Sequence, residues 1–244
     1  MNDAIYQARA ALFAQMKWPS SQADVRRLRR QVRVKLALWE WNLRTLFIVK
    51  RGLDILLSAA GLIALSPLFL LVGLAIVLED GWPMFYTQQR VGLNGRLFPF
   101  YKFRSMVRNA EKLKDKLLQQ NESGDGVIFK MKQDPRITRT GRIIRRFSVD
   151  ELPQLLNVLR GDLAVVGPRP PVPREVALYT LEERKRLHVT PGLTCFWQIQ
   201  GRSEIPFKEQ VQLDLRYIQS QSLRQDLMII LKTVPAVLLG RGAY

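Results

Sequence analysis

The sequence predicts a helix-rich α+β protein that is monotopic, meaning that it enters a membrane without crossing it. A run of 24 uncharged residues, Ile55 to Leu78, is interrupted by Ser66-Pro67 and predicts a re-entrant helix–break–helix hairpin. A basic amphipathic pattern before this run predicts a helix in the membrane interface. After Asp80, short strand-like and helix-like segments alternate. We therefore expect three parts, residues 1–51, 52–80 and 81–244.

The composition is strongly basic. The 38 Lys and Arg residues outnumber the 21 Asp and Glu residues, which gives a net charge of +17 and a pI near 10.6. This excess predicts a polyanionic partner, which is nucleic acid, an anionic membrane surface or a phosphorylated substrate. The single cysteine, Cys195, excludes an internal disulfide framework and a zinc site built from cysteines. The first 20 residues lack the pattern of a secretory signal, so we expect no cleavage.

Residues 22–46 have the pattern of an amphipathic helix. One stripe of apolar residues recurs at spacings of three or four: Val25, Leu28, Val32, Leu36, Trp39, Leu43 and Leu46. Basic residues crowd the other positions: Arg26, Arg27, Arg29, Arg30, Arg33 and Lys35. Together with Trp39 and Trp41, this pattern favours a helix lying in a membrane interface. A coiled-coil or domain-packing helix stays open as the alternative.

The apolar run from Ile55 to Leu78 allows two topologies. As one straight helix it would measure about 36 Å, long enough to cross a bilayer. The basic residues before it would then stay cytoplasmic, and everything after Asp80 would lie outside. Ser66-Pro67 instead divides the run into two arms of roughly 18 Å, each too short to cross alone. We favour a hairpin bent at Ser66-Pro67, because it returns the basic domain to the side where nucleotide phosphates are found.

The segment after the hairpin predicts a mixture of short elements. We expect strands over Met84–Gln89, Leu97–Phe103 and Val127–Met131, the first two joined by a turn over Val91–Gly95. Further expected helices are one capped by Ser105 with the stripe Met106, Ala110, Leu113 and Leu117, one ending at Gly161, one over Glu175–His188, one over Leu213–Ile218 and an apolar one over Leu227–Leu239. The last is too short to span a membrane and suits its interface. The only histidine, His188, is interpreted as structural.

Two adjacent carboxylates, Asp150-Glu151, follow Arg145-Arg146 in this basic chain. One interpretation is a capping box, in which Ser148 caps a helix and Glu151 reaches back to its first turn. Pro153 argues for a register in which Asp150 is the cap, because proline is tolerated only in the first turn. In either register the pair lies among unpaired N–H groups, where an anion or a metal-bridged phosphate also binds. Capping and chemistry both stay open on the local pattern.

Arg169 lies in a rigid loop, between Pro168 and Pro170-Pro171. A pre-positioned guanidinium is suited to binding a phosphate. The alternative is a loop arginine that pairs with a nearby acid.

Several ordered motifs of the chain match one known family over Val49 to Tyr244. They are Lys50-Arg51-Gly52-Leu53-Asp54, Ser66-Pro67, Tyr101-Lys102-Phe103-Arg104-Ser105-Met106, Ser148 to Gln154, Asn157 to Asp162, Gly167-Pro168-Arg169-Pro170, Trp197-Gln198, Gly201-Arg202 and Leu213-Asp214. With these motifs the chain resembles the bacterial sugar transferases, the monotopic phosphoglycosyl transferases. Val149 and Cys195 depart from the family's usual leucine and glycine. The hexose-1-phosphate branch looks most similar, from Phe129-Lys130 and from the ending Gly240 to Tyr244.

The resemblance implies transfer of a hexose-1-phosphate from a UDP-sugar to undecaprenyl (polyprenyl) phosphate, with release of UMP. It implies that Asp150 is the nucleophile of a covalent intermediate and that Glu151, together with Asp150, holds Mg²⁺. Phosphate oxygens are expected at Arg145, Arg169 and Arg202, with Lys102 and Arg104 close by. Asp214 is expected to place one of these cations.

The same resemblance implies a place in the cell and in metabolism. We expect the bacterial inner membrane, with the catalytic domain on the cytoplasmic face in contact with membrane lipid, and a role in starting exopolysaccharide or lipopolysaccharide (O-antigen or capsule) assembly. The competing hypothesis is a membrane-tethered basic protein that binds nucleic acid or anionic lipid. No nucleic-acid motif is recognisable in the sequence, so we expect no nucleic-acid partner. The transferred sugar and the oligomeric state, with a homo-oligomer among the options, stay open.

Overall fold

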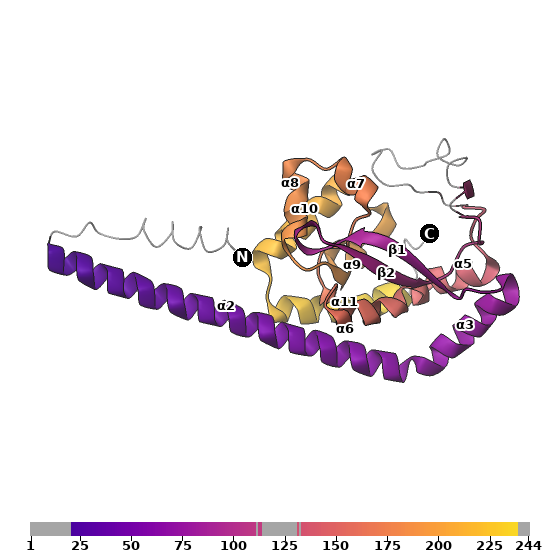
Figure 1. Cartoon of the computed structure of the whole chain (residues 1–244), viewed down its shortest axis with the longest axis horizontal. Coiled ribbons are helices and arrows are strands. Elements are labelled where there is room, and N and C mark those ends of the chain that lie inside the picture. The colour runs from indigo at the N-terminus through magenta and orange to yellow at the C-terminus, as the bar shows by residue number, and fades with distance from the viewer. Residues whose placement is uncertain (1–20, 111, 114–130, 132, 239–244) are drawn as a thin grey trace. The chain divides into compact units, whose positions relative to one another are not determined.

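The structure is a computed structural model that describes residues 21–110, 112–113, 131 and 133–238. The chain forms two compact units, Met1–Gly52 and Leu53–Tyr244. Figure 1 shows the second unit as helices around the β1–β2 ribbon, which is the helix-rich α+β class predicted. Apart from Met131, the predicted strand over Val127–Met131 lies outside the described residues, and so do the motifs Phe129-Lys130 and Gly240–Tyr244.

Two helices meet at the predicted break. Helix α2 spans Gln22–Ala64 and helix α3 spans Ser66–Asp80. The segments Thr45–Ala64 and Ser66–Asp80 are bent by 60° relative to each other. Pro67 stands in the first turn of α3, where its missing N–H is harmless, and the Ser66 hydroxyl donates to the Ile63 carbonyl oxygen at 2.8 Å. The break at Ser66-Pro67 is confirmed.

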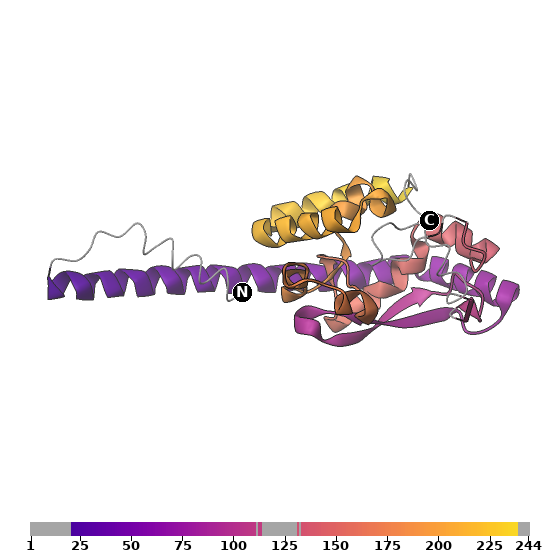
Figure 2. The ribbon, with the colours of Figure 1, turned by 90° about the horizontal axis from the view of Figure 1, so that it is seen from above.

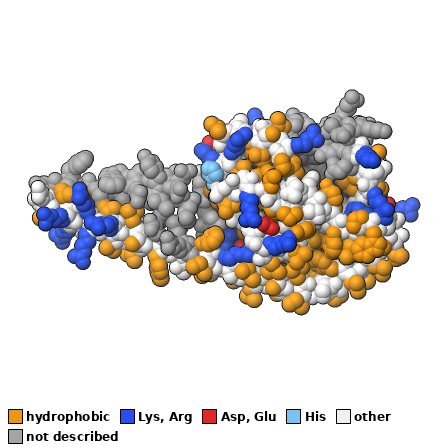
Figure 3. Space-filling model, viewed as in Figure 1, with side chains coloured by type: hydrophobic (Ala, Val, Ile, Leu, Met, Phe, Trp, Pro, Cys, Tyr) orange, Lys and Arg blue, Asp and Glu red, His pale blue; other side chains and the backbone are white. Residues whose placement is uncertain are grey.

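The length and composition of this bent helix pair are compatible with insertion into a membrane. Among the described residues, none of the single helices is both long and apolar enough to cross a bilayer, whereas the two halves of the bend pass that test together. Helix α3 exposes a row of leucines, namely Leu70, Leu71, Leu74 and Leu78. In Figure 3, hydrophobic side chains dominate the lower edge of the second unit. The structure is therefore compatible with a re-entrant hairpin, which stays a prediction.

Strands β1 (Phe85–Val91) and β2 (Leu97–Phe103) form an antiparallel hairpin, as predicted. The turn between them is the 3-10 helix η1 (Leu93–Gly95), in which Asn94 adopts a left-handed φ of 54°. Asparagine tolerates this conformation better than most residues. Tyr86, Gln88 and Arg90 alternate along β1, so they share one face of the ribbon.

A second, parallel pair of strands was not predicted. Strand β3 (Ala164–Val166) pairs with β4 (Gly192–Thr194). The backbones come so close that a Cβ atom on Gly192 would lie 2.0 Å from the Gly167 nitrogen. Both glycines are therefore required at this crossing.

The remaining elements are short helices. They are α5 (Arg139–Arg146), η3 (Val149–Gln154), α6 (Leu155–Arg160), α7 (Pro173–Ala177), α8 (Leu181–Arg184), η4 (Lys185–His188), α9 (Phe196–Gln200), η5 (Arg202–Glu204), α10 (Phe207–Ser220) and α11 (Leu223–Leu238). Figure 2 shows α10 and α11, in orange and yellow, on one side of the second unit and the β1–β2 ribbon on the other.

Two helix predictions have the wrong bounds. Ser105 does not cap a helix, because Met106 forms an isolated antiparallel bridge with Ile137; helical residues begin at Ala110 and include Leu113, and the predicted stripe position Leu117 lies outside the described residues. The expected helix over Glu175–His188 is interrupted, because Thr180 is extended and caps α8, with its hydroxyl accepting from Glu183 N at 3.3 Å. Charge and apolar spacing located helical residues in both segments, but the bridge at Met106 delays the first helix and the Thr180 cap divides the second.

Two carboxylates, the buried Asp54 and the exposed Glu79, tie the bent helix pair to the rest of the second unit. Asp54, on α2, accepts a hydrogen bond from the Val165 N–H at 3.0 Å. Glu79, at the end of α3, accepts from the backbone N–H groups of Arg139 and Thr140 at 2.7 and 2.8 Å. An acidic group suits the first turn of α5, which has unpaired donors and the positive end of the helix dipole. The apolar hairpin thus holds the helix that leads into the acidic pair.

Candidate active site

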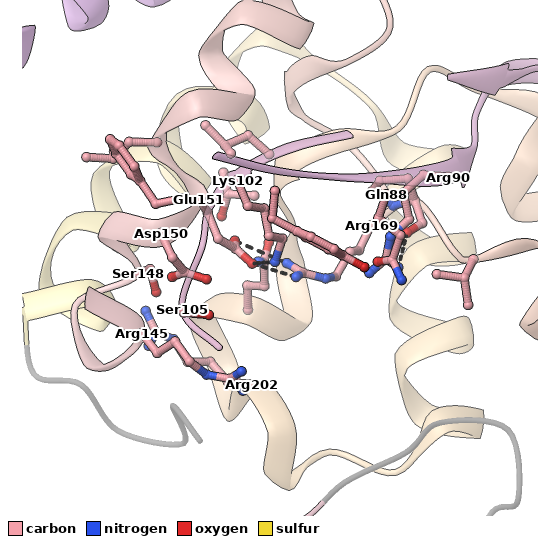
Figure 4. Close-up of a pocket in the computed structure, with 18 of the residues that line it drawn as sticks. Gln88, Arg90, Lys102, Ser105, Arg145, Ser148, Asp150, Glu151, Arg169 and Arg202 are labelled. Atoms are coloured by element: carbon pink, nitrogen blue, oxygen red, sulfur yellow. Dashed lines mark hydrogen bonds and ion pairs between the residues drawn. The ribbon is translucent and has the colours of Figure 1, made fainter. Parts of the chain in front are cut away.

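A hollow of about 970 Å³ in the second unit gathers most of the predicted site residues. It is lined by both carboxylates and five of the six predicted binding residues: Asp150, Glu151, Lys102, Arg104, Arg145, Arg169 and Arg202. Figure 4 shows Asp150 with Arg145 and Arg202 on one side and with Glu151, Lys102 and Arg169 on the other. Asp214 does not line the hollow.

The acidic pair lies on a tight turn rather than on a capped α-helix. Ser148 has a left-handed φ of 53° and its side chain makes no capping hydrogen bond. The 3-10 helix η3 spans Val149–Gln154 with Pro153 inside it, and α6 starts at Leu155. The capping-box interpretation is therefore wrong, because the Glu151 side chain is engaged elsewhere.

Glu151 is held by two cations. Its Oε1 accepts hydrogen bonds from Lys102 Nζ at 3.0 Å and from Arg169 Nη2 at 2.5 Å, and its Oε2 accepts from Arg169 Nη1 at 3.2 Å. Burial alone would raise the pKa of Glu151, but the charges and hydrogen bonds of Arg169 and Lys102 hold it well below its usual range. Arg169 is thus paired with an acid, the alternative that its rigid loop had left open.

Asp150 is buried but not engaged. Its side chain is 7% exposed, and it makes no hydrogen bond or ion pair with any residue that the structure describes. Burial raises the pKa of Asp150, and Glu151 adds to this effect, although Lys102, Arg145 and Arg169 act in the opposite direction. An additional cation beside Asp150 would therefore favour its ionised form. The pKa values of the two neighbouring carboxylates are therefore shifted in opposite directions.

Arg145 and Arg202 stand beside Asp150 with unused donors. In the described part of the chain, neither guanidinium makes a hydrogen bond or an ion pair. Both are half-buried, and Arg202 has a left-handed φ of 54°. A non-glycine residue in that conformation is uncommon and costs about 1 kcal/mol or more. Five N–H donors per guanidinium, aimed at a hollow, suit phosphate oxygens.

The loop that carries Arg169 is braced from two sides. Gly192 N donates to the Pro168 carbonyl oxygen at 2.8 Å, and Val91 N donates to that of Pro171 at 2.9 Å. Arg90 adds a hydrogen bond from Nη1 to the Pro170 carbonyl oxygen at 3.0 Å. Prolines restrict the loop further. Arg169 is therefore fixed before any ligand arrives.

Lys102 is positioned through β2. The buried Asn157 accepts from Tyr101 N at 3.1 Å and donates to the Pro99 carbonyl oxygen at 2.6 Å, which ties β2 to α6. Helix α6 follows directly after η3, so one side chain sets the distance between the strand with Lys102 and the turn with Glu151. Burial lowers the pKa of Lys102, and Glu151 offsets this only in part.

Two predicted residues have other partners than expected. Arg104 lines the hollow, but its Nη2 donates to the carbonyl oxygens of Gly81 and Asp80 at 2.5 and 3.2 Å, so it closes the end of α3. Asp214 forms a buried ion pair with Arg186 and holds none of the arginines that the sequence selected. Burial raises the pKa of Asp214 to about 6, despite the nearby charge of Arg186.

The acidic pair is compatible with Mg²⁺, although the described residues contain no cluster of three or more His, Cys, Asp or Glu side chains that would hold a metal alone. Mg²⁺ usually takes only one or two protein carboxylates, and substrate phosphates and waters complete its shell. Asp150 has free acceptor positions, whereas Lys102 and Arg169 occupy about three of the four on Glu151. The residues fit a metal that is shared with a phosphorylated substrate.

Residues 45–240 match the family model described as bacterial sugar transferase. This chain belongs to the bacterial sugar transferase family. It is therefore a transferase, and the resemblance inferred from its motifs is confirmed. Residues 22–44 of α2 precede the matched region.

Curated relatives of this sugar transferase are 39% to 47% identical to it over the aligned residues. It is 43% identical over 200 residues to the exopolysaccharide production protein ExoY of Sinorhizobium fredii, covering 81% of the chain and 88% of ExoY. It is 47% identical over 199 residues to the galactosyl transferase CpsE of Streptococcus agalactiae, covering 80% of the chain and 43% of CpsE. It is 43% identical over 199 residues to the undecaprenyl-phosphate galactose phosphotransferase of Salmonella typhimurium, covering 80% of the chain and 42% of that protein. The chain thus spans most of ExoY but less than half of the other two.

The sequence reading of this transferase missed Arg90 and Gln88, which line the same hollow. Arg90 is half-buried against the Phe100 ring, 5.2 Å from its centroid, and burial lowers its pKa to about 10. The strand pattern could have identified them. Every second residue of a strand faces the same side, so Tyr86, Gln88 and Arg90 form a polar row on one face of β1. What the pattern could not show is that this row faces Arg169.

Proposed function

We propose that this transferase moves a hexose-1-phosphate from a UDP-sugar to undecaprenyl (polyprenyl) phosphate, with release of UMP, through a covalent intermediate on Asp150. The observation that carries the proposal is the contrast between the neighbouring carboxylates, since Asp150 is free beside unpaired arginines while Glu151 is saturated by cations. The printed names of relatives, such as undecaprenyl-phosphate galactose phosphotransferase and undecaprenyl-phosphate glucose phosphotransferase, agree with this reaction.

In the first half-reaction, an Asp150 carboxylate oxygen attacks the phosphorus that carries the sugar. A bond forms between this oxygen and phosphorus, the diphosphate P–O bond breaks, and the bridging oxygen leaves with UMP. In the second half-reaction, a phosphate oxygen of the lipid attacks the same phosphorus. The bond to Asp150 breaks, the carboxylate is restored, and the product is a lipid-linked diphosphate sugar. Splitting one difficult displacement into two is the advantage of covalent catalysis.

The cations divide between the two sides of Asp150. Arg145 and Arg202 have free donors, so they are suited to neutralise phosphate oxygens at the reacting centre. The braced pair of Arg169 and Lys102 presents positive charge without reorganisation, because Glu151 already holds both side chains in place. Mg²⁺, bound by Asp150 and one oxygen of Glu151 together with substrate, would supply further neutralisation of the diphosphate.

The proposed location is the cytoplasmic face of the bacterial inner membrane. The bent helix pair supports it, because a re-entrant hairpin would place the site where a soluble nucleotide and a lipid phosphate both arrive. The name exopolysaccharide production protein, carried by a relative, supports a role in starting polysaccharide assembly, with O-antigen and capsule as related products. The net charge of +17 also fits the basic binding-protein hypothesis, but a phosphorylated substrate explains that charge as well, and the family assignment favours the transferase.

The test follows both half-reactions. Purified protein is incubated with Mg²⁺ and a UDP-sugar labelled at the phosphate next to the sugar, with and without undecaprenyl phosphate. We expect UMP release, lipid-linked label with the acceptor, and protein-bound label without it. Asp150→Asn should lower turnover by about 10⁴-fold or more, because it removes the nucleophile. Turnover undiminished in Asp150→Asn, or turnover without any protein-bound label, would refute the covalent route.

A further inference from the structure

The hollow that holds Asp150 has a second, apolar end. Side chains along one face of α11 line it, namely Ile230, Thr233, Val234 and Val237. Leu65, at the bend between α2 and α3, lines the same hollow. The charged centre and this apolar face therefore belong to one continuous cavity of about 970 Å³.

The four positions on α11 form a single helical stripe. Residues three, four and seven apart lie on the same face, so the stripe covers about 10 Å along the helix. Thr233 is the only polar member, and its hydroxyl is already used: it donates to the Ile229 carbonyl oxygen at 2.8 Å and lies 2.8 Å from the Thr194 hydroxyl. This face offers a ligand apolar contact and no free side-chain hydrogen bond.

The stripe is accessible in the part of the chain that the structure describes. Val234 is 56% exposed, although it is apolar and lines a cavity. Burying such a side chain against an apolar ligand is favourable, and the gain scales with the area removed from water. A sugar nucleotide, which is polar along its whole length, gains nothing there.

We propose that this face of α11, together with Leu65, seats the first isoprene units of the lipid acceptor. The inference rests on the proposed function and adds the place where the acceptor's hydrocarbon chain lies. A polyprenyl phosphate needs one cavity with two characters: cations for its head group and an apolar wall for the chain next to it. Arg145 and Arg202 provide the first beside Asp150, and the α11 stripe provides the second.

A matched pair of variants tests this assignment. Val234→Ser removes apolar surface from the stripe, while Leu231→Ser makes a similar change at a 64% exposed position of the same helix that does not line the hollow. We expect Val234→Ser to raise the KM for undecaprenyl phosphate about tenfold, and Leu231→Ser to leave it within about twofold, because loss of methyl contacts in an apolar pocket has effects of this size.

A short acceptor separates the cavity from general membrane contact. Geranyl phosphate carries only two isoprene units and is water-soluble, so we expect it to inhibit transfer to undecaprenyl phosphate competitively, with an inhibition constant about tenfold weaker in Val234→Ser than in Leu231→Ser. No inhibition by geranyl phosphate, or equal inhibition constants in the two variants, would overturn the proposal, the latter showing that α11 acts only through the membrane.

The failure of this proposal is distinguishable from failure of the proposed function. Exchange of labelled UMP into the UDP-sugar uses only the first half-reaction and needs no lipid. If wild-type protein shows no exchange, the proposed function fails. If exchange occurs and the ratio of lipid transfer to exchange is equal in Val234→Ser and Leu231→Ser, the acceptor site alone is wrong.

Discussion

The turn that carries Asp150 and the loop that carries Arg169 position their side chains in different ways. The Arg169 loop is fixed by prolines and by hydrogen bonds to β1 and β4, and its guanidinium is fixed again by Glu151. The Asp150 turn depends on one left-handed serine, and its carboxylate has no partner in the described residues. The site thus combines Asp150, a carboxylate free of partners in that part of the chain, with a fixed group of charges. We call this group, Glu151 with Lys102 and Arg169, the electrostatic frame. In the proposed mechanism, these contacts keep the Glu151 carboxylate bound to Lys102 and Arg169, so that Asp150 alone is available as the nucleophile.

Removing the charge of Glu151 should damage the frame most. Glu151→Gln leaves Lys102 and Arg169 partly buried without a counter-charge, so we expect the free energy of unfolding to fall by about 3 kcal/mol. We expect kcat to fall about 10²-fold, because the frame no longer presents its charge in one geometry. Unfolding by urea and UMP release measure the two effects. Glu182→Gln is the control, since its exposed ion pair with Lys185 should contribute under about 0.5 kcal/mol. Equal effects of the two variants would refute the frame.

Keeping the charge of Arg169 but changing its shape should have a smaller effect. Arg169→Lys cannot bind both oxygens of Glu151 in the parallel geometry seen here. We expect kcat/KM to fall about tenfold to a hundredfold, with the KM for UDP-sugar raised. Arg174→Lys, at an exposed position of α7, should change neither constant. Full activity of Arg169→Lys would mean that only positive charge is needed at this position.

The two carboxylates should also separate by pH. The pKa of Asp150 is raised by burial, so its reactive, ionised fraction falls as the pH decreases through a value above the ordinary one of about 3.9. The pKa of Glu151 is lowered by Arg169 and Lys102, so Glu151 stays ionised through that window. We expect kcat/KM to decrease as the pH is lowered, with the slope of a single protonation, and this decrease should begin above about pH 4. Circular dichroism over the same range controls for unfolding. A profile that stays flat down to about pH 4 contradicts a raised pKa of Asp150.

The smallest expected effect concerns the serine before the pair. Ser148→Gly should be nearly neutral, because glycine adopts a φ of 53° freely. Ser148→Val should lose about 1 to 2 kcal/mol of stability and shift Asp150, since a branched side chain is strained in this region. Thermal unfolding and UMP release provide the readouts. If valine is tolerated as well as glycine, the left-handed conformation of Ser148 does not position Asp150.

Local patterns predicted the parts of the fold that local physics decides. The strand-forming residues of Leu97–Phe103, after a turn, predicted β2 with its observed bounds, and Ser66-Pro67 predicted the bend. The resemblance gave the residues around Asp150, of which all but Asp214 line one hollow. Contacts between distant segments were not predictable. The pairing of β3 with β4 joins two strands of three residues each, and no pattern reveals which distant segment such a short strand will meet.

The capping box failed for the same physical reason. Ser148 and Glu151 have the right spacing, but spacing alone does not show that Arg169, 18 residues away, offers Glu151 a stronger partner than the backbone. Arg104 lines the hollow, but the sequence did not show that its Nη2 donates to the carbonyl oxygens of Asp80 and Gly81 at the end of α3. The sequence indicated which polar residues gather at the candidate site, and the tertiary fold decided the partner of each one.

Asp54 and Glu79 make hydrogen bonds with Val165 and with the start of α5, so the bent helix pair is part of the folded second unit. It cannot be removed without affecting the site. A chain that starts at Phe85 would leave three backbone N–H groups without their acceptors, and two of them begin the helix that ends at the acidic turn. Removing the bent helix pair by truncation should therefore yield inactive protein. A bent helix pair exchanged between relatives would have to retain both carboxylates, Asp54 and Glu79.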